Sequence, residues 1–113
     1  MNKNYQAGRN FEYRVMRYFE KKGYYCMRSA GSKGQIDVVA IPTEIKTNVD
    51  VLLIQCKHGA KISKKERENL IALDVEMHMG VSCIVAWAKP NSKITFFAWQ
   101  WQINKSEWGE IKL

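Results

Sequence analysis

At 113 residues, 46% of them hydrophobic and 26% charged, the sequence has the composition of one globular domain, large enough for a core without stabilising cross-links. Its 18 Lys and Arg against 11 Asp and Glu give a net charge of +7, which fits a polyanion partner and equally a solvated basic surface. Bilayer-spanning apolar runs and the apolar core of a secretory signal are lacking, so we expect an intracellular, cytoplasmic protein with no membrane partner. Three isolated cysteines, Cys26, Cys56 and Cys83, suggest neither a zinc site nor a disulfide framework.

The first half of the chain predicts a helix followed by three strands. Phe11, Val15 and Phe19 recur at helical spacing, and Gly23 supplies a residue that commonly ends helices. Three runs rich in aromatic, β-branched and apolar residues come next, separated by a Gly/Ser loop and a polar connection. These elements cover residues 4–22, 24–28, 36–41 and 52–57.

The second half predicts another helix and two more strands. Ser63 and Glu66 have the spacing of a capping box, in which each side chain satisfies a backbone donor at the start of a helix. Strands follow at residues 82–87 and 94–101, whereas the residues after 101 fit no element. Because a helix joins the third strand to the fourth, we expect an α/β fold with a mixed, five-stranded central sheet flanked by helices, in the order α-β-β-β-α-β-β.

Polar residues stand out in the second and third predicted strands. If these strands form a hairpin centred near Lys46, Asp37 lies opposite Gln55, with the Cβ atoms about 5 Å apart. Lys57 is two residues beyond Gln55 and faces the same side. A carboxylate, an amide oxygen and an ammonium would then converge, an arrangement that can hold a divalent cation against a phosphate.

Each of these residues also has a purely structural explanation. Asp37 can cap the loop before it, Lys57 can extend into solvent, and Gln55 can bond a neighbouring loop. Glu12, beside the apolar stripe of the first helix, can reach over the sheet toward Asp37 or pair with arginines on the helix surface. The joint pattern is harder to explain by structure alone, so we treat these residues as a candidate site.

The order of these motifs resembles the PD-(D/E)XK nuclease superfamily, with a helical Glu12, an Asp37 after a Gly/Ser loop, and a strand ending Gln55-Cys56-Lys57. Within that superfamily, residues 8–12 (GRNFE) and 28–32 (RSAGS) are similar to the opening of the archaeal-type Holliday junction resolvases. The small size and residues 84–97 are similar to that family too. The resemblance implies a restriction-endonuclease-like core and a single nuclease domain over residues 1–113.

The resemblance also implies metal-dependent hydrolysis of a DNA phosphodiester. Asp37, Gln55 and the backbone carbonyl of Cys56 would bind Mg²⁺, for which Mn²⁺ can substitute. Glu12 would bind the metal directly or through water, and Lys57 would orient or deprotonate the attacking water. The residues that would contact the DNA backbone are Arg9, Arg28, Ser29, Ser32, Lys33, His58, Lys61 and Lys64.

One position departs from the resolvase pattern, because Gln55 stands where those enzymes have Glu. In this respect the chain looks more like Mrr-type restriction nucleases, and a neutral amide should bind Mg²⁺ more weakly than a carboxylate. The resemblance implies a homodimer that resolves four-way DNA junctions by paired symmetric nicks. The alternatives are an Mrr-like restriction or repair endonuclease acting on duplex DNA, and a catalytically silent DNA-binding module.

Overall fold

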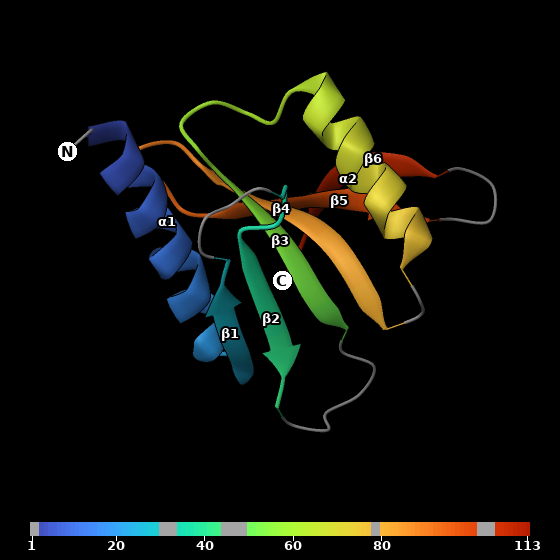
Figure 1. Cartoon of the computed structure of the whole chain (residues 1–113), viewed down its shortest axis with the longest axis horizontal. Coiled ribbons are helices and arrows are strands. Elements are labelled where there is room, and N and C mark those ends of the chain that lie inside the picture. The colour runs from blue at the N-terminus through green and yellow to red at the C-terminus, as the bar shows by residue number, and fades with distance from the viewer. Residues whose placement is uncertain (1–2, 30–33, 44–49, 78–79, 102–105) are drawn as a thin grey trace.

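The structure, a computed structural model, describes residues 3–29, 34–43, 50–77, 80–101 and 106–113. Within these residues, two helices and six strands form one α/β arrangement (Figure 1). The elements are α1 (Lys3–Glu20), β1 (Tyr24–Arg28), β2 (Val38–Pro42), β3 (Val51–His58), α2 (Lys64–Glu76), β4 (Val81–Ala88), β5 (Thr95–Gln100) and β6 (Glu107–Ile111). Their order confirms the expected α-β-β-β-α-β-β series and adds one strand at its end.

The strands lie side by side in their sequence order, from β1 to β6. Neighbouring strands are antiparallel except β3 and β4, which run parallel because α2 connects them as a crossover. The expectation of a mixed sheet flanked by helices is therefore confirmed.

The described sheet has six strands, one more than the five expected. β6 pairs antiparallel with β5, which places Trp108 beside Trp99 and Ile111 beside Phe96. Its sequence, EWGEI, holds a glycine and two glutamates, residues that are uncommon inside strands, so the local pattern gave no signal. The strand forms because β5 offers an edge to pair with, which is a tertiary effect rather than a local one.

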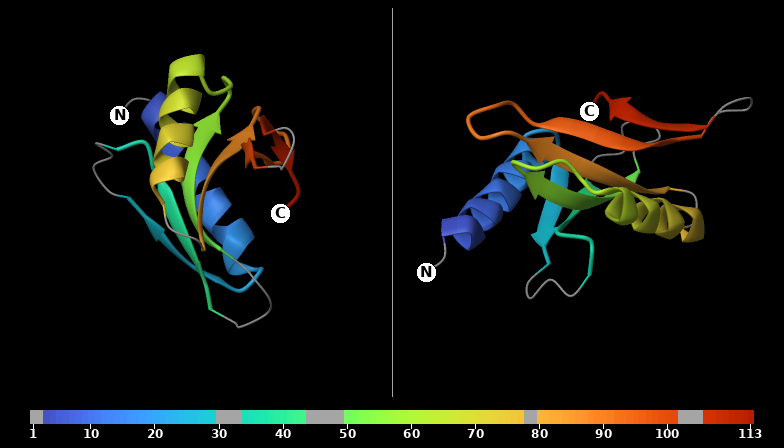
Figure 2. Two further views of the ribbon diagram at one scale, coloured as in Figure 1. Left: turned by 90° about the vertical axis from the view of Figure 1, so that its right-hand side faces the viewer. Right: turned by 90° about the horizontal axis from the view of Figure 1, so that it is seen from above.

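The two helices lie on opposite faces of the sheet (Figure 2). On one face, Phe11 and Phe19 of α1 are buried in one cluster with Ile54 of β3. On the other face, Leu70 of α2 is buried in a cluster with Val85 of β4. Because strand side chains alternate between faces, odd-numbered residues of β3 point to the α2 side and even-numbered ones to the α1 side.

The start of α2 has the capping box that the sequence predicts. The Ser63 hydroxyl accepts the backbone N–H of Glu66 at 3.1 Å, and the Glu66 carboxylate accepts the backbone N–H of Ser63 at 3.0 Å. This reciprocal pair fixes where the helix begins and therefore where the Glu66 side chain lies. Neither helix in the described part of the chain is long and apolar enough to cross a membrane.

Candidate active site

The hairpin of β2 and β3 has the predicted register. Val38 pairs with Ile54, and the backbone N–H of Asp37 donates to the Ile54 carbonyl at 2.8 Å. The register of the paired residues is therefore the predicted one, and Asp37, just before β2, is bonded to β3 through its own N–H. The predicted centre of the connection, Lys46, lies outside the described residues.

Asp37 is held by both of its neighbouring strands. Its Oδ2 accepts the backbone N–H of Cys56 at 2.8 Å, and its backbone carbonyl accepts the N–H of Ser29 at 2.8 Å. Burial raises the pKa of the Asp37 carboxyl above its ordinary value; the charge of Glu12 adds to this, while the Cys56 N–H and two nearby cations oppose it. Carboxyls perturbed by burial together with specific charges are concentrated at functional sites.

Glu12 reaches the same end of the sheet from α1. Its Oε1 lies 2.7 Å from Nε of Arg28 on β1, in an ion pair between two partly buried side chains. This cross-element pair differs from the pairing with helix-surface arginines considered above. Burial is the main cause that raises the pKa of the Cys56 thiol, and the charges of Asp37 and Glu12 raise it further. Glu12, Asp37 and Cys56 therefore lie near one another on the α1 side.

Gln55 and Lys57 lie on the α2 side of β3, where both contact Glu66. Lys57 Nζ is 3.0 Å and 3.2 Å from the two carboxylate oxygens of Glu66, and Gln55 Nε2 donates to Glu66 Oε2 at 3.1 Å. The Ser63 N–H, and to a smaller degree Lys57, lower the pKa of the Glu66 carboxyl. The sequence indicated Glu66 only as a helix cap, because its contact with β3 depends on where α2 crosses the sheet.

The residues present fit a hard divalent cation. Gln55 is 6% exposed, and its Oε1 is buried with no hydrogen-bond partner among the described residues. A buried amide oxygen without a partner is costly unless a ligand or ion satisfies it. Within the described ranges, no three His, Cys, Asp or Glu side chains form a metal cluster by themselves. A metal here would therefore need amide or backbone oxygens besides Asp37, and oxygen ligands of this kind suit Mg²⁺.

The expected DNA-contacting residues divide into two groups around this site. Arg28 and Ser29 lie beside it, since Arg28 binds Glu12 and Ser29 donates to Asp37. The remaining residues within the described ranges are more scattered. Arg9 is partly exposed on α1. Ser32 and Lys33 lie outside the described residues.

His58 is the last residue of β3, and Lys61 and Lys64 follow it in the chain. The His58 ring lies 5.3 Å from the Phe11 ring, between centroids. Lys61 stands 5.4 Å above the Trp87 ring, in a separate cavity of about 290 Å³ on the α2 face. Lys64 Nζ is 3.9 Å from a carboxylate oxygen of Glu68 on the exposed side of α2. The structure thus does not bring Lys61 and Lys64 together with Asp37.

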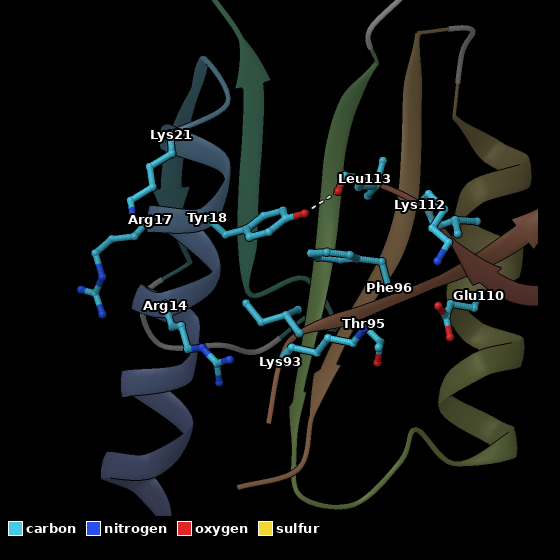
Figure 3. A pocket seen from close by; sticks show the side chains of 12 residues that line it. Arg14, Arg17, Tyr18, Lys21, Lys93, Thr95, Phe96, Glu110, Lys112 and Leu113 are labelled. Atoms are coloured by element: carbon cyan, nitrogen blue, oxygen red, sulfur yellow. Dashed lines mark hydrogen bonds between the residues drawn. The ribbon is translucent and has the colours of Figure 1, made fainter. Parts of the chain in front are cut away.

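A basic groove lies elsewhere, between α1 and the β5–β6 pair (Figure 3). The groove has a volume of about 510 Å³ and an apolar floor that includes Tyr18 and Phe96. Tyr18 donates a hydrogen bond to the Leu113 carbonyl at one edge. Glu110 is the one carboxylate among its described lining residues. The cations around the groove are Arg14, Arg17, Lys21, Lys93 and Lys112.

The sequence of this chain is similar to those of a known protein family. Residues 3–113 match a family model described as archaeal Holliday junction resolvase (Hjc). A crossover junction endodeoxyribonuclease Hjc from Methanocaldococcus jannaschii is 37% identical over 76 residues, which cover 64% of this chain and 53% of that protein. The chain therefore spans about half the length of this relative.

A solved structure gives the same result at the level of the fold. Archaeoglobus fulgidus Hjc, a Holliday junction resolvase from an archaeal hyperthermophile, superposes with a TM-score of 0.61 at 25% identity. The superposition covers 81% of this chain and 72% of that one. The mixed sheet with one helix on each face is therefore the arrangement of a Hjc nuclease.

Proposed function

Because the chain belongs to the archaeal Holliday junction resolvase family, we propose that it is an endodeoxyribonuclease that resolves four-way DNA junctions by paired symmetric nicks. The observation that carries the proposal is that Asp37, at one end of the β2–β3 hairpin, accepts the backbone N–H of Cys56, the residue between Gln55 and Lys57. Family membership supports the substrate, and this geometry supports the chemistry.

The proposed chemistry is metal-dependent hydrolysis. Asp37, the Gln55 amide oxygen and the backbone carbonyl of Cys56 would hold Mg²⁺ or Mn²⁺, with Glu12 binding directly or through water. The bound cation would act as a Lewis acid on the phosphate and lower the pKa of a bound water. Gln55 Oε1, which is buried and has no hydrogen-bond partner among the described residues, supports this assignment.

The remaining roles fall to side chains that surround the scissile phosphate. Lys57 would orient the attacking water through its ammonium protons and stabilise the negative charge that builds on the phosphate. Arg28 and Ser29, beside Glu12 and Asp37, would contact the adjoining DNA backbone. These contacts position the strand without reading its sequence.

We also propose that the active form is a homodimer. A four-way junction presents two equivalent strands, and symmetric nicks need two copies of one site related by a two-fold axis. Equilibrium sedimentation of the protein alone and with a junction tests this point directly. A single protomer bound to each junction would contradict it.

The second candidate is an endonuclease that acts on ordinary duplex DNA. Gln55 favours it, since the same Gln-x-Lys ending resembles Mrr-type restriction nucleases. A DNA-binding module without catalysis is the third alternative, in which Asp37 and Lys57 would have only structural roles.

One cleavage assay separates these candidates. The protein is incubated with a synthetic four-way junction or the matching linear duplex, in Mg²⁺, Mn²⁺ or EDTA, beside the Asp37→Asn variant. Paired nicks in the junction alone, dependent on Mg²⁺ and lost in the variant, support the proposal. Equal cutting of duplex favours the second candidate, and binding without cutting in Mg²⁺ or Mn²⁺ favours the third.

A further inference from the structure

One carboxylate on α2 connects three parts of the site. Glu66 accepts hydrogen bonds from Lys57 Nζ at 3.0 and 3.2 Å, from Gln55 Nε2 at 3.1 Å, and from the Ser63 backbone N–H at 3.0 Å. The last contact fixes Glu66 at the first turn of the helix, and the first two fix side chains of β3. The capping box therefore also joins the start of α2 to the end of β3.

This contact determines which way the Gln55 amide faces. An ionised carboxylate only accepts hydrogen bonds, so the amide group nearest Glu66 must be the nitrogen. The amide oxygen then turns away from α2, where it is buried without a hydrogen-bond partner in the described part of the chain. Glu66 thus orients Gln55 so that the amide oxygen of Gln55, rather than its amide nitrogen, faces any ion bound beside it.

Charge leads to the same residue. Asp37 and Lys57 lie close enough for their opposite charges to interact, and Glu12 is paired with Arg28. These groups together leave little net negative charge for a divalent cation. Glu66, whose side chain is 36% exposed beside a Lys57 side chain that is 26% exposed, supplies that charge next to the neutral amide. A groove between the 34–35 segment and α2 reaches both Gln55 and Glu66.

We propose that Glu66 is a positioning residue of the site, which orients the Gln55 amide and the Lys57 ammonium and provides the negative charge that the amide lacks. This inference rests on the proposed metal-dependent function, because it assigns Gln55 as a ligand. It also predicts that the carboxylate and the amide can exchange places between positions 55 and 66.

Glu66→Gln tests the proposal while keeping the helix cap, because Gln also serves at this position of a capping box. The new amide nitrogen would face Gln55 Nε2, donor against donor, and would force one amide to turn. We expect Mn²⁺ affinity of the DNA-free protein, measured by electron paramagnetic resonance, and the junction nicking rate each to fall about 10- to 100-fold.

Two variants serve as controls. Glu68→Gln removes an equal charge from the same helix, at an exposed ion pair with Lys64, and should leave both measurements unchanged. Ser63→Ala removes the hydroxyl of the cap and keeps the carboxylate, so it reports the effect of a weaker helix start alone. Thermal melts of each variant identify any loss of folding.

The double variant Gln55→Glu/Glu66→Gln gives the decisive result. Its amide at 66 can donate to a carboxylate at 55, which restores both the hydrogen bond and the charge. We expect it to recover most of the Mn²⁺ affinity and nicking rate lost in Glu66→Gln, which a role limited to helix capping would not produce. The proposal would be overturned if Glu66→Gln had the same Mn²⁺ affinity and nicking rate as Glu68→Gln. It would also be overturned if the double variant recovered neither quantity relative to Glu66→Gln.

Failure of the proposed function is distinguishable from failure of this inference. A wild-type protein that never nicks junctions refutes the function, but the Mn²⁺ titrations of the DNA-free variants still compare Glu66 with Glu68. A wild-type protein that nicks junctions while Glu66→Gln does so equally well, with equal Mn²⁺ affinity, refutes only the role of Glu66.

Discussion

The end of the β2–β3 hairpin and the basic groove beside α1 use charge in opposite ways. At the hairpin end, charges come in bonded pairs of opposite sign, such as Glu12 with Arg28 and Lys57 with Glu66. In the groove, five cations surround an apolar floor with one described carboxylate, Glu110. Paired charges fix the positions of side chains, whereas a one-sided field attracts a polyanion without fixing it.

The two regions also lie on different sides of α1. At 3.6 residues per turn, Arg14 and Arg17 point roughly away from Glu12 around the helix axis. One helix can therefore carry a site residue on one side and the wall of the groove on the other. The difference predicts that substitutions at the hairpin end change the rate of cleavage, and that substitutions in the groove change the affinity for DNA and its dependence on salt.

The largest effect is expected for Asp37→Asn. The amide keeps an oxygen to accept the Cys56 N–H but loses the charge that would bind the metal. We expect nicking of a four-way junction to fall more than about 100-fold, beyond the usual loss for a residue that only supports a ligand. Junction binding measured in Ca²⁺-free buffer with EDTA should remain, and an active variant would remove Asp37 from the site.

How much of this site could be predicted depends on how local each contact is. The register of the β2–β3 hairpin follows from the alternation of side chains along two strands, so it was predicted correctly. The expected convergence of Asp37, Gln55 and Lys57 on one face is not observed, because Asp37 bonds to the Cys56 backbone near Glu12 while Gln55 and Lys57 bind Glu66. The contact of Glu66 with Lys57 and Gln55 depends on where α2 crosses the sheet, which the sequence does not specify.

The fold shows the same division. The capping box and the crossover follow from short motifs and their order, and both are confirmed. β6 was missed because its pairing with β5, rather than its own residues, makes it a strand. The partner of Glu12 was likewise not predictable, since Arg28 reaches it from another element.

A smaller effect is expected in the groove. Replacing Arg17 and Lys21 by Gln removes two cations without touching the core, because both side chains are exposed. If each contacts a phosphate, the slope of log affinity against log salt should become less steep by about 0.9 per contact, while the cleavage rate at saturating junction stays unchanged. Lys65→Gln, an exposed position outside the groove, is the matched control. A slower rate at saturation would contradict the separation of the two regions.

The folding stability of the Gln55→Glu variant tests the contact between Gln55 and Glu66 at the hairpin end. The substitution sets two carboxylates at the distance of a hydrogen bond, where Gln55 Nε2 now donates to Glu66 at 3.1 Å. We expect the buried site to lose about 1–3 kcal/mol of folding stability in EDTA, seen as a lower Tm, and to regain most of it when Mn²⁺ is added. A Tm equal to that of the wild type in EDTA would mean that the two side chains do not interact.

The smallest expected effect is a rise in Tm for Asp37→Asn without metal. Burial raises the pKa of the Asp37 carboxyl, so the folded state binds its proton more tightly than the unfolded state does. The ionised carboxylate therefore costs stability at every pH above its unfolded pKa, and this cost grows until the pH passes the raised, folded pKa. Near pH 7 in EDTA, the neutral amide should give the higher Tm, and the difference should shrink as the pH falls toward the ordinary carboxyl range.

The same measurement in Mn²⁺ should reverse the order of the two proteins. A cation bound at Asp37 stabilises the folded wild type in proportion to its occupancy, and the variant gains less because it lacks the charge. A site that lowers stability until its ligand arrives is the expected form of a pre-organised metal centre. If Asp37→Asn stayed the more stable protein at saturating Mn²⁺, Asp37 would be a structural carboxyl, and the hairpin end would not be where the metal binds.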